Sequence, residues 1–486
     1  MIPKPSEVIH SVADRYQAAR AAKEIPFWIV FWISLYTPFE EFVIKWLGPL
    51  AGIARFVPEL VLYGLMAQVL TSRFFKRNLK PTPIDLLLVL FFLSTLISIA
   101  LNDSSLKASF LNLRSLWRYL SVFYIVVNID ISVSRLSLII TSLRTAGLVQ
   151  AAIASVQFFL PNSLLRLFAP KGVQIAGYSR VSHAEAGTTK VGAVFGLFAA
   201  PAVLSAFLLV ILIISMTYFF TTPGALMSRL PELSGIGTIF FGLFATKKRA
   251  AWILAVLVPI VVLIFYRKSK GLVKTVWVYT AVALSVVLLT TLLGTSFDTS
   301  FEGTQAREES IDVGSYVLQL FDPNYWEDSS ETSRGWVVGT TIHTLTKSGS
   351  WFGFGPDLYQ MRQLMADVLV DGSDRAKIIA MGPLEDTYWL IMLAYFGVVG
   401  MGIYAVIIWR LFQSGRWLIK FSPDPEYRRL GVIFCTLVIF TILYNFIERI
   451  LELRGFSLYF WLFAGLVVNA YNAHQRQRIE SSPVDD

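Results

Sequence analysis

Long apolar stretches separated by short polar segments recur along almost the whole chain of 486 residues. A helix needs roughly 20 apolar residues to cross the hydrocarbon core of a bilayer, so each stretch predicts a transmembrane helix. Twelve are expected, near residues 26–47, 55–71, 84–102, 115–131, 136–161, 191–220, 233–246, 250–266, 275–296, 387–411, 430–447 and 452–471. The first, which Pro38, Glu40 and Glu41 interrupt, and the short seventh depart most from a continuous apolar run.

The positions of the basic residues predict an orientation. Arg and Lys concentrate in cytoplasmic loops of membrane proteins, and here they gather in the loops after the second, eighth and tenth stretches. The chain is therefore expected to run as a cytoplasmic segment 1–25, helices one to nine over 26–296, a large periplasmic loop 297–386, helices ten to twelve over 387–471, and a cytoplasmic tail 472–486. The large loop holds 15 acidic and 6 basic residues, as expected for the outer side.

Composition supports the membrane assignment and excludes other classes. Hydrophobic residues make up 55% of the chain and charged residues 15%, against roughly 25% charged in an average soluble domain. This composition excludes a soluble enzyme and a disordered protein. A disulfide scaffold is excluded because Cys435 is the single cysteine. The net charge of +9 resides largely in short loops, so we expect a lipid bilayer and no nucleic acid as partner.

The large loop is expected to fold into short helices over the membrane domain. Ser and Thr residues near Glu331 predict a helix start, and Arg334, Val338, Ile342 and Leu345 follow at helical spacing before Gly349 ends the run. The next segment, SWFGFGPDLY, predicts a turn through Gly353, Gly355 and Pro356. The expected fold class is thus all-α, with about 12 transmembrane helices and one large extracytoplasmic loop that contains short helices. One use for such a loop is as a lid over a lateral groove.

One basic cluster breaks the orientation rule. Lys247, Lys248 and Arg249 lie between the seventh and eighth stretches, on the expected outer side. Either the short seventh span is miscounted, or cations face outward because an anion binds there. Arginines on the same side are candidates to grip a phosphate with their planar donor forks; they are Arg180, Arg307 and Arg334.

Two of these segments resemble the O-antigen ligase and polymerase superfamily of bacterial surface-glycan assembly. In that family an Arg follows Ser or Thr at the outer start of a mid-chain span; here ATKKRAAWILAVL has Arg249, with Lys248 in place of the hydroxyl residue. The family's large outer loop has an Arg, then a Trp, and later a Gly-x-Gly turn. SRGW and GSWFGFGPD match this order and contribute Trp336 and the two turn glycines.

A third segment matches only in part. The family's loop ends in a His-Asn pair, followed by Leu, Leu and Gly at fixed spacing. LEDTYWLIMLAYFGVVG keeps Leu390, Leu393 and Gly397, but Asp386 and Thr387 stand where the pair is expected. The resemblance covers roughly residues 170–450, including the segment GAVFGLFAAPAVLSAFL. It implies a membrane glycosyltransferase that uses an undecaprenyl diphosphate-linked glycan donor without metal or cofactor, with Arg249 and Arg334 holding the diphosphate.

Candidate bases for the acceptor hydroxyl follow from the residues. Glu385 and Asp386 are adjacent at the outer mouth of the tenth span, and neighbouring carboxylates tend to raise one another's pKa; a solvated acidic edge is the competing interpretation. His343 follows Arg334 by nine residues and is a further catalytic candidate, although a lone His is more often a surface residue. Glu40 and Glu41 mark a cavity or an ion pair, in contact with the acceptor or with Arg180.

Three functions are compatible with these features. The first is polymerisation of lipid-linked repeat units on the periplasmic face of the bacterial inner membrane by inverting transfer, with a chain-length regulator as a candidate partner. A ligase that moves a finished glycan to a lipid or protein acceptor is the nearest alternative. A flippase for the same lipid-linked glycan is the alternative from another class, but no pairing of two related halves is evident between residues 1–240 and 241–486.

Overall fold

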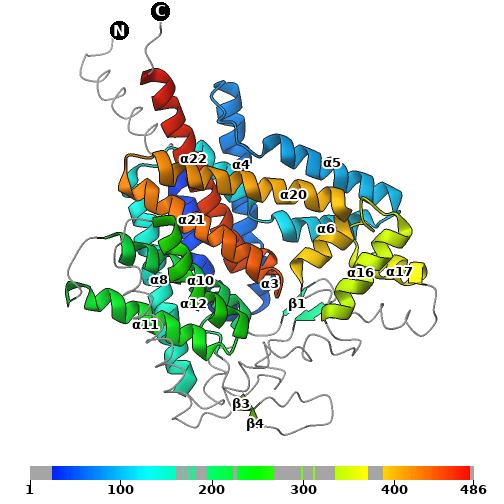
Figure 1. Ribbon diagram of the computed structural model, residues 1–486, viewed down its shortest axis with the longest axis horizontal. Coiled ribbons are helices and arrows are strands. Elements are labelled where there is room, and N and C mark those ends of the chain that lie inside the picture. Colours follow the sequence, from blue (N-terminus) through cyan, green and yellow to red (C-terminus); the bar gives the residue numbers. More distant parts are fainter. Residues whose placement is uncertain are drawn as a thin grey trace, which may run out of the picture.

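The computed structural model describes most of the expected helical regions. It describes residues 24–159, 168, 173–175, 178–180, 194–222, 227–266, 297–298, 310–311, 334–369 and 387–481. Seven helices in these ranges are long and apolar enough to cross a membrane: Glu24–Lys45, Gly48–Phe75, Val133–Phe159, Pro201–Thr221, Tyr388–Phe421, Pro425–Tyr444 and Arg454–Gln475. The protein is therefore a helical membrane protein (Figure 1).

Figure 1 labels all but α7 of the helices that matter below. The long ones are α4 (Val57–Phe75), α8 (Val133–Phe159), α10 (Pro201–Thr221), α20 (Tyr388–Phe421), α21 (Pro425–Tyr444) and α22 (Arg454–Ser481). Shorter ones are α5 (Asp85–Leu101), α6 (Leu106–Trp117), α7 (Leu120–Asn128), α11 (Leu230–Ala245), α12 (Arg249–Tyr266), α16 (Arg334–Ser348) and α17 (Leu358–Leu369). Two hairpins of short strands complete the set: β1 (Val173–Ile175) with β2 (Tyr178–Arg180), and β3 (Phe297–Asp298) with β4 (Ser310–Ile311).

Among the described residues, the expected spans agree with helices in most places and differ in two. The stretch 115–131 is not one helix, because α6 ends at Trp117 and α7 begins at Leu120, with the side chain of Arg118 drawn into an ion-pair network. The stretch 191–220 becomes helical only at Pro201. The buried amides of Gln150 and Gln157 hold the residues before it, since Leu197 N–H donates to Gln150 Oε1 at 3.0 Å and Gly196 N–H to Gln157 Oε1 at 2.8 Å. The stretch 275–296 lies outside the described residues.

The most deeply buried helices are α10 and α22. Within their apolar windows, 78% and 83% of the residues are buried. A helix that is apolar all round is typical of a protein core or a membrane span, and here α10 packs against α8, α11, α12, α21 and α22. On the other side, α22 packs against α7 and α20, and α20 against α5. These two helices form the centre around which the polar helix ends are arranged.

Polar contacts divide the helix ends into two groups. One group, which we call the arginine end, joins the loops through pairs such as Arg454–Glu40 and Lys248–Glu448. The opposite end is joined through pairs such as Lys80–Asp130 and Arg144–Glu232. The helix α20 begins at the arginine end, where α16 and α17, drawn in yellow in Figure 1, pack against it.

Candidate functional site

A buried glutamate organises the arginine end. Glu59, in the first turn of α4, is 2% exposed and accepts hydrogen bonds from Arg114 of α6. Arg118 Nε lies 3.2 Å and Arg454 Nη2 3.3 Å from Glu59 Oε1. Arg454 also donates through Nη1 to Glu40 Oε1 at 2.9 Å. Residues from four separate segments thus share one network.

A second pair extends this network toward the first helix. Arg55, 5% exposed, donates to Glu41 Oε2 at 2.6 Å, and its carbonyl oxygen accepts from Arg454 at 3.0 Å. The network contains four arginines and three glutamates, so it carries one excess positive charge when all are ionised. Arg55 Nε is buried and has no hydrogen-bond partner in the described part of the chain. Buried charges are costly unless paired, and each of the four arginines has at least one carboxylate partner.

The sequence left two interpretations of Glu40 and Glu41 open, a cavity or an ion pair. Glu40 and Glu41 bind Arg454 and Arg55 respectively, so the ion-pair interpretation applies. Arg180 is described only as a backbone position in β2, opposite Val173 of β1. The interruption of the first span therefore positions carboxylates that balance arginines from α22 and from the segment before α4.

The turn between α21 and α22, residues 445–453, brings two of the sequence-predicted segments together. Lys248 Nζ lies 2.6 Å from Glu448 Oε1, and Lys248 directly precedes Arg249, the first residue of α12. The Tyr388 N–H donates to the Asn445 carbonyl oxygen at 3.1 Å, and Tyr388 follows Asp386 by two residues. The start of α12 and the start of α20 are therefore fastened to the same turn.

The sequence suggests that Lys248 binds a phosphate, but in the structure Lys248 is paired with Glu448. Its ammonium already has a carboxylate partner, and both side chains are partly buried, at 35% and 20% exposure. The Glu448 carboxylate balances the charge of Lys248, and this ion pair attaches the start of α12 to the 445–453 turn. The side chains of Arg249 and Arg334 lie outside the described residues, although their backbones begin α12 and α16.

The same turn holds an amide without partners. The Asn445 side chain is fully buried, and neither its Nδ2 nor its Oδ1 makes a hydrogen bond within the described ranges. An unsatisfied buried polar group costs about 1–3 kcal/mol. The amide is held there by the backbone of the turn, whose Asn445 carbonyl oxygen accepts from the Tyr388 N–H at the start of α20.

The three motif glycines form one joint. Helix α20 is broken at Gly397, whose φ is 63° and ψ −169°. The break frees two carbonyl oxygens, and the turn before α17 binds them: Phe354 N–H donates to Ala394 O at 2.8 Å and Gly355 N–H to Tyr395 O at 3.1 Å. The Gly-x-Gly turn and the distant Gly397 are thus one structural unit.

Glycine is required at each of these positions. A Cβ on Gly397 would collide with the Trp351 carbonyl oxygen and the Gly353 nitrogen, and one on Gly353 would lie 2.5 Å from the Gly397 nitrogen. A Cβ on Gly355 would collide with Ser104 Oγ. All three glycines also have positive φ, which side chains disfavour. The joint fixes α17, and α16 with it, over the start of α20.

Helix α16 confirms the predicted loop helix but turns a different face to the protein. It runs from Arg334 to Ser348 and ends at Gly349 with φ 65°, as expected. Val337 and Leu345 are buried, whereas Val338 is 37% and Ile342 48% exposed. Thr341 and Thr344 complete the buried face, because hydroxyls bonded to carbonyls one turn earlier are compatible with packing.

The remaining candidates have these positions. His343 is exposed on α16, which favours the surface-residue interpretation. Trp336 is described only by its backbone in α16. Arg307, Glu385 and Asp386 lie outside the described residues.

Sequence reasoning missed the core of the arginine network. The missed residues of the network are Arg55, Glu59, Arg114, Arg118 and Arg454. A separate pair in the 445–453 turn, Arg449 and Glu452 at 3.2 Å, was missed as well. A signal for them existed, because each is a charge at the edge of an apolar run, and such charges usually mark functional or paired positions.

Comparison with known proteins adds no relative: no family model and no curated protein matches this chain.

Proposed function

We propose that this protein is a polymerase of undecaprenyl diphosphate-linked oligosaccharide repeat units, of the O-antigen or exopolysaccharide type. The proposal begins from the resemblance of three separate segments to one superfamily. The observation that carries it further is the convergence of those segments at the arginine end. Gly353, Gly355 and Gly397 interlock, and the chain at Arg249 and the chain after Asp386 both attach to residues 445–448.

The proposed chemistry assigns a role to each group. Arg249 and Arg334 hold the diphosphate and stabilise the negative charge that develops on it as it leaves. Asp386 or Glu385 removes the proton from an acceptor hydroxyl, whose oxygen attacks the anomeric carbon from the face opposite the diphosphate. The bond between that carbon and the phosphate oxygen breaks, the configuration inverts, and the new glycosidic bond forms. Arginines take the role that metal ions have in other glycosyl transfers, so no metal or cofactor is expected.

The proposed setting is the bacterial inner membrane. Both termini would be cytoplasmic, with twelve spans, and the arginine end would face the periplasm. The division of polar contacts into two ends supports this arrangement, since the basic loops around Lys80 and Arg429 lie at the opposite end. The donor and acceptor glycans would meet beneath α16 and α17, with a chain-length regulator as a further partner.

A broken helix also occurs in transporters, where freed backbone groups bind the cargo. Here the carbonyls that the break at Gly397 frees are already occupied by Phe354 and Gly355. Ser98 Oγ donates to the Tyr395 carbonyl as well, at 3.0 Å. The break therefore serves to seat the turn, which favours an enzyme over the flippase alternative.

A product-length assay tests the proposal. Purified protein in detergent is incubated with the lipid-linked glycan fraction of its host and a chelator, and the glycans are resolved on a gel. We expect a ladder of lengthening products that Arg249→Ala and Arg334→Ala abolish. Arg410→Ala, an exposed residue of α20 far along the helix from the site, is the matched control and should leave the ladder intact.

The outcomes separate the three functions. Labelling of an added acceptor without lengthening would support the ligase. Movement of the lipid-linked glycan across proteoliposomes without either product would support the flippase. A normal ladder from both arginine variants would refute the proposed grip on the diphosphate.

A further inference from the structure

The exposed face of α16 is divided into an apolar row and a polar row. Val338 and Ile342 are 37% and 48% exposed, and His343 and Lys347 are also exposed. Residues four positions apart in a helix lie one above the other, so each pair forms a row along α16. At about 3.6 residues per turn, the two rows are about 140° apart around the helix axis. The surface that α16 turns away from the protein is therefore itself amphipathic.

Two exposed aromatic side chains follow α16 in the chain. Trp351 is 67% and Tyr359, in the first turn of α17, 68% exposed. The Trp351 carbonyl oxygen accepts from the Val399 N–H at 3.3 Å, and the neighbouring Val398 of α20 is 56% exposed. The exposed surface of the loop helices thus meets the exposed surface of a membrane span at Trp351. Trp and Tyr are enriched where a bilayer meets water, with their rings at the level of the headgroups.

The length of α5 gives the depth of this surface in the membrane. Helix α5 begins at Asp85, near the opposite end of the bundle, and has 17 residues. At the helical rise per residue this length is about 26 Å, close to the roughly 30 Å of a hydrocarbon core. At the far end of α5, Asn102 Nδ2 donates to the Gly353 carbonyl oxygen at 3.0 Å, and Gln360 of α17 donates to the Asn102 carbonyl oxygen. The turn between α16 and α17 is therefore fastened at the boundary of the hydrocarbon core.

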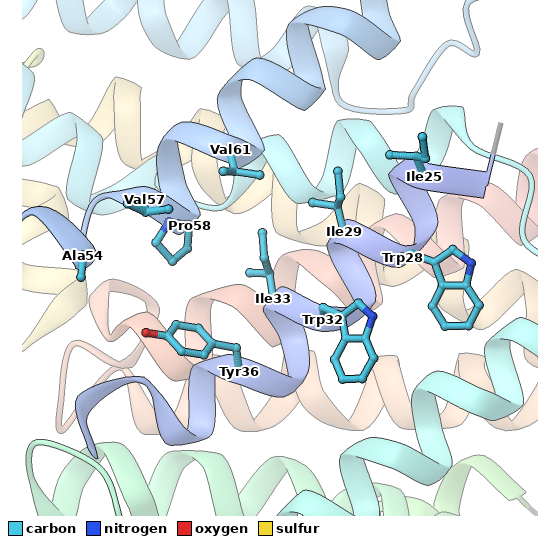
Figure 2. Close-up of a pocket in the computed structure, with 10 residues that line it drawn as sticks. All are labelled: Ile25, Trp28, Ile29, Trp32, Ile33, Tyr36, Ala54, Val57, Pro58 and Val61. Atoms are coloured by element: carbon cyan, nitrogen blue, oxygen red, sulfur yellow. The ribbon is translucent and has the colours of Figure 1, made fainter. Parts of the chain in front are cut away.

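Surfaces within the hydrocarbon core have a different composition. Figure 2 shows an apolar recess between the first span and α4, in which Trp28 and Trp32 are labelled and none of the ten lining residues is charged. Every exposed residue of α5 is likewise apolar. A charged side chain such as Lys347 is costly at that depth. Beside an apolar row it is typical of an amphipathic helix in the headgroup region, which buries its apolar side by roughly 5–10 Å.

We propose that α16, the turn at Trp351 and the start of α17 dock on the lipid leaflet at the arginine end. The apolar row of α16 lies in the headgroup region and the polar row faces water. The depth measured along α5, the two rows on α16 and the exposed aromatic rings all indicate the same position. The cover over the start of α20 is then held on two sides, by the joint at Gly397 and by lipid. This inference does not depend on the proposed function.

Spin labels on the two rows test the inference in the full-length protein. The labels are attached to Val338→Cys and Ile342→Cys in the apolar row and, as matched controls, to His343→Cys and Lys347→Cys in the polar row. The only native cysteine, Cys435, is fully buried, and the unmodified chain gives the background labelling. In vesicles of phosphatidylethanolamine and phosphatidylglycerol, collisions are measured with oxygen, which concentrates in lipid, and with a nickel chelate, which remains in water.

We expect the ratio of oxygen to nickel collisions to be severalfold higher in the apolar row than in the polar row. Leu96→Cys, at an exposed position of α5, should give a still higher ratio as the reference for the hydrocarbon core. Equal ratios in the two rows would mean that α16 lies in water and would overturn the inference. Few collisions with either reagent at Val338 and Ile342 would mean that protein covers the row, a second copy or another partner, and would overturn it equally.

Tryptophan fluorescence gives an independent readout. Bromine on a lipid quenches a tryptophan that it contacts, so the difference between the wild-type chain and Trp351→Phe reports the surroundings of this one ring. Trp351→Phe should lower the quenching by lipids brominated near the headgroup more than the quenching by lipids brominated near the chain ends. An equal reduction for both lipids, or none, would place Trp351 away from the headgroups and overturn the inference.

Discussion

The joint at Gly397 yields a sharp prediction about stability. Replacing Gly397 by Ala places a Cβ against the carbonyl oxygen of Trp351 and the nitrogen of Gly353, at a φ of 63°. The turn cannot remain where it is, and the helix cannot keep its break without strain. We expect Gly397→Ala to expel the turn from α20.

The magnitude follows from what is lost. Gly397, with φ 63° and ψ −169°, lies in a region of backbone conformation that is essentially confined to glycine, and a residue with a side chain there costs about 1–3 kcal/mol. The two hydrogen bonds from Phe354 and Gly355 to the freed carbonyls contribute about 0.5–1.5 kcal/mol each. The expected destabilisation is thus about 2–6 kcal/mol by these principles. Gly402→Ala, in the same helix with open space around it, should stabilise by about 0.5–1 kcal/mol.

Thermal unfolding in detergent, followed by tryptophan fluorescence, measures both variants. Limited proteolysis of residues 349–357 tests the mechanism, since expulsion of the turn should expose it in Gly397→Ala alone. Equal unfolding temperatures for Gly397→Ala and Gly402→Ala, or equal rates of cleavage, would refute the interlock as the reason for glycine here.

Three further predictions concern the arginine end. Glu448→Gln frees the Lys248 ammonium beside Arg249, so the KM for the diphosphate-linked donor should fall severalfold. An unchanged KM would contradict the idea that Glu448 reduces the attraction of Lys248 for the diphosphate. Asn445→Leu removes two unsatisfied buried polar atoms, so the unfolding temperature should hold or rise; a fall of the unfolding temperature would contradict the absence of partners for this amide among the described residues. Glu40→Gln removes one of the two carboxylates that Arg454 contacts and should destabilise by about 1.5–3 kcal/mol, and a double variant that also carries Arg454→Gln should recover part of the loss. Additive losses in that double variant would show that the two side chains do not interact.

The local sequence pattern was sufficient to predict individual helices, but it did not predict which of their faces contact the rest of the protein. The loop helix and its end at Gly349 were predictable, because a run of helical spacing closed by glycine is a local signal. Its buried face was not, since Thr341 and Thr344 pack inward while Ile342 faces out, and apolarity alone ranks them in the reverse order. The tertiary neighbours α17 and α20 decide the rotation.

The break in α20 shows the same limit. Gly397, Gly400 and Gly402 are similar in sequence, and only Gly397 has a positive φ. The determinant is the turn at Trp351 and Gly353, which is more than 40 residues earlier in the chain. The arginine network was missed for a related reason: Glu40 and Arg454 are 414 residues apart, and an average of hydropathy over one span does not register a partner in another.

The turn at residues 445–453 explains how one short segment can organise the site. It joins α21 and α22, whose windows are 67% and 83% buried, so its two ends are held by the packed centre of the bundle. Groups on such supports keep their geometry better than groups on loops. By contrast, α16 leaves half of its surface exposed and packs mainly against α17 and α20. The fixed side of the candidate site therefore belongs to the turn, and its cover belongs to α16 and α17.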